Sequence, residues 1–100
     1  MPRLLSDSEI VDGLGRLGGW ERQGDEIRRS VGFASFADAI AFVVRVGFLA
    51  EAHDHHPDID IRWRTVHLVL STHSEGGITD LDLTVAAGID EIARGGGATG

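Results

Sequence analysis

Apolar residues recur every three or four positions in three stretches of the chain, a spacing that predicts three amphipathic helices. The first helix begins at a capping box formed by Ser6 and Glu9 and ends at the Gly18-Gly19 pair. Its buried face is expected to carry Ile10, Leu14 and Leu17. The third helix begins after Thr79, which is a preferred N-cap residue. Its apolar stripe consists of Val85, Ile89 and either Ile92 or Ala93.

The second helix is apolar on nearly all sides. It begins at Ser35 and ends near His55, because the residue before Pro57 is pushed out of the α region. We assign to one face Phe36, Ile40, Val43, Gly47 and Ala50. The opposite side carries Phe42, Val44, Phe48 and Leu49. Since a domain this small has too little core to bury both sides, we expect a subunit interface in a homodimer or homotetramer.

Alternation of apolar and polar residues predicts two pairs of strands between the helices. The first pair covers residues 20–22 and 27–33, and the second covers 58–63 and 65–72, with Trp63 in the core. The order of elements is α-β-β-α-β-β-α. It predicts an α+β fold in which three helices pack on one face of a four-stranded, mainly antiparallel sheet.

Composition fits one domain of residues 1–94, followed by a Gly-rich tail (95–100) that has nothing to pack against and is expected to be disordered. The absence of cysteine excludes disulfides and thiolate catalysis. The net charge of −7, with arginine as the only strongly basic residue, argues against direct nucleic-acid binding. The longest apolar segment is too short for a membrane span, so we expect a cytoplasmic protein with no membrane contact.

Histidines are concentrated at the end of the second helix, where three of the chain's five fall at His53, His55 and His56. A further one, His73, lies at a predicted strand end. Imidazole changes charge near neutral pH, so such a cluster suits proton transfer. Two other interpretations stay open. The segment could be a solvated helix end, or it could bind metal with carboxylates such as Asp58 and Asp60, although the spacing matches no specific ligand set.

Two distant segments together resemble the pterin-4a-carbinolamine dehydratase family. The residues that carry the resemblance are Glu51-x-x-Asp54-His55-His56-Pro57, Trp63, Val66-His67, Leu70-Ser71-Thr72-His73, Gly77, Thr79 and Asp82. The resemblance covers nearly the whole chain. It implies dehydration of a 4a-hydroxytetrahydropterin to the quinonoid dihydropterin during tetrahydrobiopterin recycling, in a pathway with an aromatic amino acid hydroxylase. No metal and no bound cofactor are implied, since the pterin is the substrate.

The resemblance also implies roles for individual residues. His56 and His73 would transfer a proton to the leaving hydroxyl, while His55 would contact the substrate and remove a proton. Glu51 and Asp82 would orient the imidazoles. The substrate-binding set is Asp54, His55, His56, Pro57, Ser71, Thr72 and His73. Structural alternatives remain for four of these residues: Asp82 could be only a helix-start carboxylate, Glu51 only a solvated side chain, and Ser71 and Thr72 ordinary strand residues.

Ile59 stands where the family often has an aromatic residue, which bears on packing around the pocket but not on the histidines. Glu75 lies where animal members carry a small or thiol residue, so the coactivator role of those members is not expected here. His67 is expected to be supporting or structural. The Gly13–Gly18 segment fits a dinucleotide-binding G-x-G-x-x-G pattern, but it follows a capped helix rather than a strand, so we reject that function.

The rival hypotheses are a non-catalytic dimerisation or assembly factor on the same fold and a metal-dependent hydrolase.

Overall fold

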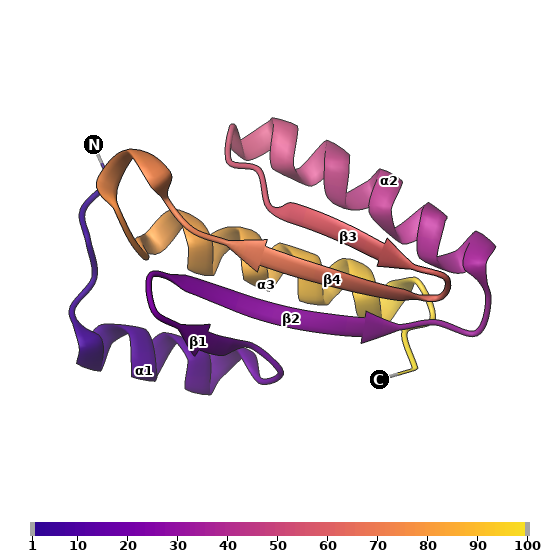
Figure 1. Ribbon diagram of the computed structural model, residues 1–100, viewed down its shortest axis with the longest axis horizontal. Coiled ribbons are helices and arrows are strands. Elements are labelled where there is room, and N and C mark those ends of the chain that lie inside the picture. The colour runs from indigo at the N-terminus through magenta and orange to yellow at the C-terminus, as the bar shows by residue number, and fades with distance from the viewer. Residues whose placement is uncertain (1, 100) are drawn as a thin grey trace.

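Three helices pack on one face of a four-stranded sheet whose strands lie in the order β1-β2-β4-β3 (Figure 1). The computed structural model describes residues 2–99. Its elements are α1 (Asp7–Leu17), β1 (Glu21–Gln23), β2 (Glu26–Gly32), α2 (Phe36–His53), β3 (Asp58–Arg62), β4 (Thr65–Leu70), a short 3-10 helix η1 (His73–Glu75) and α3 (Asp80–Gly95). All neighbouring strands are antiparallel. The α-β-β-α-β-β-α order and the α+β architecture are therefore confirmed.

The register of the two central strands decides which side chains reach the core. Ile27 pairs with Leu70 and Val31 pairs with Val66 across β2 and β4, and all four side chains are fully buried beneath the helices. The alternate positions of these strands face the side of the sheet that carries no helix. On that open side, Ser30 and His67 are direct partners in the β2–β4 register.

A buried ion pair ties the last helix to the sheet. The Asp90 carboxylate on α3 accepts hydrogen bonds from the Arg29 guanidinium on β2 and from the indole N–H of Trp20, the latter at 2.8 Å. Asp90 is 3% exposed, so its charge depends on these two donors. The pair fixes the position of α3 beneath the sheet.

Capping boxes define the start of the first helix and of the last helix. In α1 the Ser6 hydroxyl accepts from the Glu9 N–H at 3.2 Å, and the Glu9 carboxylate accepts from the Ser6 N–H at 2.8 Å. The hydrogen bond from the Arg3 guanidinium is the largest cause that lowers the pKa of Glu9 to about 2. In α3 the corresponding box joins Thr79 to Asp82. The predicted cap of α1 is confirmed, and the box in α3 draws Asp82 into the interior.

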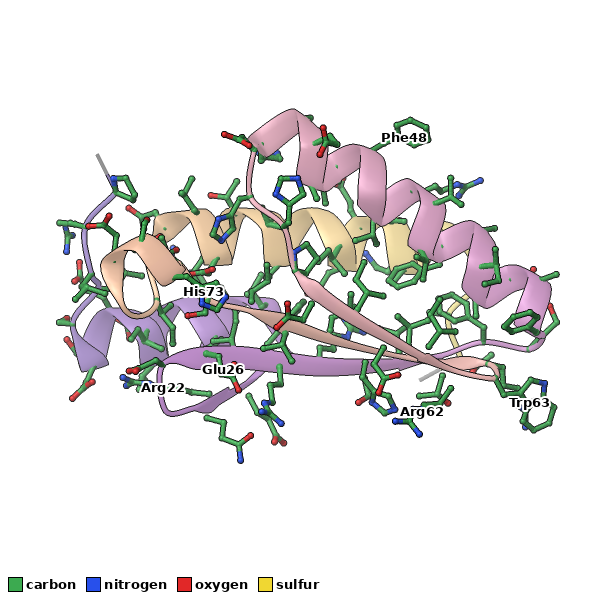
Figure 2. All side chains as sticks on the ribbon, turned by 45° about the horizontal axis from the view of Figure 1, so that its top comes forward. Arg22, Glu26, Phe48, Arg62, Trp63 and His73 are labelled. Carbon is green, nitrogen blue, oxygen red and sulfur yellow. The ribbon has the colours of Figure 1, made fainter. Side chains whose placement is uncertain are left out.

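The predicted face of α2 is partly wrong. Its buried residues are Ala39, Phe42, Val46 and Ala50. Phe36, Ile40, Val44 and Phe48 instead form an exposed stripe, and Figure 2 shows Phe48 directed away from the sheet. A helix that is apolar on all sides gives no periodic signal, so packing against β4 and α3 decides its inner face. Of the five residues assigned together, only Ala50 is fully buried.

Trp63 is not in the core. Strand β3 ends at Arg62, and Trp63 occupies the tight β3–β4 turn with a φ of 56°. Its side chain is 71% exposed and projects from the end of the sheet (Figure 2), with the Arg64 guanidinium 4.9 Å from its ring centroid. The strand pattern predicted one residue too many, which placed the turn residue on the buried face.

The end of the described chain makes contacts that the composition did not suggest. Ala98 packs against the core, and the Thr99 N–H donates to the Gly32 carbonyl at 2.7 Å. Residues 98 and 99 therefore lie against the domain, whereas the sequence suggested a tail with nothing to pack against. None of the helices within residues 2–99 has both the length and the apolar character that crossing a bilayer requires.

Candidate active site

A cavity of about 300 Å³ opens where the link after α2 meets the segment that follows β4. Figure 2 shows His73 at this end of the sheet, beyond the tip of β4. The cavity is lined by Asp54, His55, His56, Ser71, Thr72, His73 and Ser74. The two histidine-bearing segments that are distant in the sequence thus meet at one site.

The end of α2 sends two consecutive imidazoles in different directions. Asp54 caps the helix in the left-handed conformation, with φ 48° and ψ 43°, which aspartate tolerates better than most residues. The chain then has no regular structure through His55 and His56 to Pro57, and β3 begins at Asp58. As a result His55 is buried, at 9% exposure, while His56 stays at the surface.

The opposite wall is a closed loop. Thr72 and Gly77 form an isolated antiparallel bridge, in which the Thr72 N–H donates to the Gly77 carbonyl at 2.8 Å. This bridge encloses η1, whose first residue is His73. The loop therefore presents an exposed imidazole at the rim of the cavity.

His55 is held by a buried carboxylate. Its Nε2–H donates to Asp82 Oδ1 at 2.6 Å, and Asp82 is fully buried. The other oxygen, Oδ2, accepts from the Thr72 hydroxyl and from the Thr79 backbone N–H, both at 2.8 Å. Three donors thus surround one carboxylate, an arrangement that stabilises its negative charge. The structure therefore gives Asp82 a contact with the site in addition to its place in the first turn of α3.

The contact with Asp82 leaves one nitrogen of His55 available. Nδ1 makes no hydrogen bond to any residue between 2 and 99. Every fully buried side-chain nitrogen or oxygen within the same range has a hydrogen-bond partner. Because Nδ1 has none, it is not fully buried and remains accessible to solvent. Because His55 lines the cavity, Nδ1 is the nitrogen that a bound molecule can reach.

His56 and His73 differ from His55 in exposure. The Nε2–H of His56 donates to Glu51 Oε1 at 2.7 Å, with the two side chains 53% and 78% exposed. An ion pair this exposed adds little stability, so its effect is to orient the ring. The His73 imidazole makes no hydrogen bond within the described part of the chain. The cavity therefore carries three imidazoles in three different environments.

The remaining candidate residues lie in or near the same site, but the hydroxyls of Ser71 and Thr72 donate hydrogen bonds to other protein groups. Ser71 lines the cavity, and its hydroxyl donates to the Asp25 carbonyl at 2.7 Å. The Thr72 hydroxyl points inward to Asp82. Pro57 shapes the link and is not among the lining residues. Ser74 also lines the cavity and was not among the residues predicted for the site. Its position directly after His73 could have indicated it.

The residues suggested for metal binding are separated. Asp58 and Asp60 line a different hollow on the open side of the sheet, together with His67, whose Nδ1 lies 2.7 Å from the Ser30 hydroxyl. His53 is the exposed last residue of α2. Within residues 2–99 no three histidine or carboxylate side chains are grouped in a way that could hold a metal ion.

Comparison with known proteins identifies the family. The family model described as pterin 4 alpha carbinolamine dehydratase matches residues 3–92. The chain belongs to the pterin 4 alpha carbinolamine dehydratase family. A provisionally named dehydratase of this family from Roseiflexus castenholzii is 62% identical over 92 residues, covering 92% of this chain and 99% of the relative. A similarly named protein from Mycobacterium sp. (strain KMS) is 60% identical and covers 89% and 95% of the two chains.

Solved structures agree with the dehydratase family fold. The crystal structure of a transcriptional coactivator/pterin dehydratase from Brucella melitensis has a TM-score of 0.87 and 36% identity, covering 89% of this chain and 97% of that one. A pterin dehydratase-like protein described as a RuBisCO assembly factor in the alpha-carboxysome has a TM-score of 0.62 and 23% identity, covering 74% and 86%. The second likeness extends to the fold alone.

Because Asp82 is fully buried, its substitution should lower the stability of the protein. Asp82→Asn replaces one acceptor oxygen by an N–H donor and leaves at least one buried donor unpaired, so the free energy of unfolding should fall by about 1–3 kcal/mol. Asp80→Asn removes a similar charge from the same helical turn at an exposed position and should cost less than about 1 kcal/mol. Urea unfolding of both variants measures the difference. Equal losses would mean that Asp82 acts only as a helix-start carboxylate.

Proposed function

We propose that this protein dehydrates 4a-hydroxytetrahydropterins to quinonoid dihydropterins. Family membership supports the reaction class. The observation that carries the proposal is the convergence of His55, His56 and His73 on one cavity. Its volume of about 300 Å³ lies at the lower end of the range for small-molecule sites, which suits a flat bicyclic ring system.

The proposed reaction needs one proton donor and one proton acceptor. The lone pair on pterin N5 forms the C4a=N5 double bond while the C4a–O bond breaks. A general acid protonates the departing hydroxyl, which leaves as water, and a general base takes the proton from N5. Positioned histidines perform both steps efficiently near neutral pH.

We assign the basic step to His55. Its Nε2 is bonded to Asp82, so Nδ1, which has no partner among the described residues, is the nitrogen that would accept the N5 proton. His56 and His73 stand at the more exposed part of the cavity and would protonate the hydroxyl. Glu51 would hold the His56 ring at the rim. No step requires a metal or a bound cofactor.

In the cell we propose a role in tetrahydrobiopterin recycling, in the cytoplasm and downstream of an aromatic amino acid hydroxylase. That reaction class supplies the carbinolamine substrate. A non-catalytic dimerisation or assembly factor is the alternative function. It would account for the exposed apolar stripe on α2, but it offers no reason for three imidazoles around a shared cavity.

The roles of the rim histidines can be tested directly. His56→Ala and His73→Ala should each lower turnover by about two to four powers of ten, because each removes a group that moves a proton. His53→Ala removes a neighbouring histidine that does not line the cavity and should leave turnover unchanged. The measurement is dehydration of chemically generated 4a-hydroxytetrahydropterin, with and without chelator. Near-normal rates in both rim variants would refute the assigned roles, and loss of activity with chelator would refute metal-free catalysis.

We also propose that the chain forms a homodimer or homotetramer through α2. The stripe of Phe36, Ile40, Val44 and Phe48 runs along one side of the helix at four-residue spacing, with exposed fractions between 37% and 73%. Such a continuous apolar face on a small domain is typical of an interface. A second copy of the same helix would offer a matching apolar surface.

Charge placed on this stripe should separate the subunits. Phe48→Glu is expected to shift the mass in solution to that of the 10.7 kDa monomer without loss of helical content, because Phe48 makes no core contact. Gln23→Glu, on the opposite edge of the sheet in β1, adds the same charge and should leave the mass unchanged. Light scattering after size-exclusion chromatography measures both. A wild-type protein that is already monomeric would contradict the proposal.

A further inference from the structure

The hydroxyls of two buried threonines have no part in the proposed proton transfers. Thr72 is among the residues that line the cavity, and Thr79 is not. Thr79 is completely buried and Thr72 is 4% exposed. Their Oγ1 atoms are 2.7 Å apart. Thr72 belongs to the segment that carries His73, and Thr79 is the N-cap of α3. The contact therefore joins one wall of the cavity to the helix that holds Asp82.

The direction of these hydrogen bonds follows from counting protons. The Thr72 hydroxyl donates its single proton to Asp82 Oδ2, so in the contact between the hydroxyls Thr79 is the donor. The Thr79 oxygen in turn accepts from the Leu81 N–H at 3.2 Å. The chain of donors runs one way, from the first turn of α3 through both hydroxyls to the carboxylate.

This chain determines how Asp82 meets His55. With Oδ2 occupied by the Thr72 hydroxyl and the Thr79 N–H, Oδ1 is left to face His55 Nε2. An acceptor fixed at that point keeps the imidazole proton on Nε2, because the partner of one ring nitrogen sets the tautomer. The opposite nitrogen, Nδ1, then carries the lone pair on the side of the cavity.

We infer that Thr79 is a positioning residue of this site. Its hydroxyl, acting through that of Thr72, holds Asp82 in the orientation that keeps His55 protonated on Nε2 and free on Nδ1. The inference rests on the proposed function, since the His55 tautomer matters only if Nδ1 accepts a proton from a molecule in the cavity. Helix capping alone does not account for the contact, because a cap needs an acceptor for a backbone N–H but no donor to Thr72.

Two variants separate positioning from capping. Thr79→Val removes the hydroxyl and also the cap of α3. Thr72→Val breaks the same chain and leaves the Thr79 cap in place. Thr79→Ser keeps both hydrogen bonds and serves as the rescue. Thr84→Val, at an exposed position on the same helix, is the matched control.

The first readout needs no substrate. In the wild type, ¹⁵N shifts of the neutral His55 ring should show a protonated Nε2 and an unprotonated Nδ1. In Thr72→Val and Thr79→Val they should move toward the average of the two tautomers, while Thr79→Ser and Thr84→Val keep the wild-type values. If Thr79→Val fails to fold, Thr72→Val alone decides. Wild-type ring shifts in Thr72→Val would overturn the inference.

The second readout is turnover. Each valine variant should lower kcat about tenfold, because each breaks the chain of hydrogen bonds that ends on the Asp82 carboxylate, and leave KM within about twofold. Because both act on one chain, the double variant should lose little more than either single variant instead of about a hundredfold. Multiplicative losses would overturn the inference. An inactive wild type would refute the proposed function instead, and the ring shifts would still decide the role of Thr79.

Discussion

The buried carboxylate of Asp82 is the constraint on which the site depends. An ionised group without solvent must be surrounded by donors, and Asp82 finds them in three different parts of the chain: His55 after α2, Thr72 after β4 and the Thr79 N–H at the start of α3. Satisfying one charge therefore brings together the elements that form the cavity. The same contacts that stabilise the fold here also set the geometry of the imidazole.

Fold and chemistry are linked through the N-terminus of α3. In most helices a capping box only satisfies backbone donors at the surface. Here the box residue Asp82 is fully buried, and further along the same helix the buried Asp90 pairs with Arg29 of β2. The two buried carboxylates on α3 therefore have different roles. Asp90 fixes the helix beneath the sheet, and Asp82 connects it to the histidines.

Much of the fold was predictable, since caps and strand alternation are local signals. The box at Ser6 and Glu9, the end of α2 before Pro57 and the order of elements all follow from neighbouring residues. The inner face of α2 and the exposure of Trp63 were not predictable, because they depend on which surfaces the other elements offer. The histidine-bearing segments were evident from the sequence. The link from Thr79 to Asp82 and His55 was not evident from the sequence, since a threonine at the start of a helix predicts only an N-cap.

The proposed function requires that imidazoles from two remote segments line one pterin-binding cavity. Titration of the protein with a stable, unreactive pterin, followed through the ring resonances of all five histidines, measures whether they do. The signals of His55, His56 and His73 should move together and saturate at one ligand concentration, while those of His53 and His67 stay in place. Movement of His53 or His67 alone, or no movement at all, would contradict the proposed function.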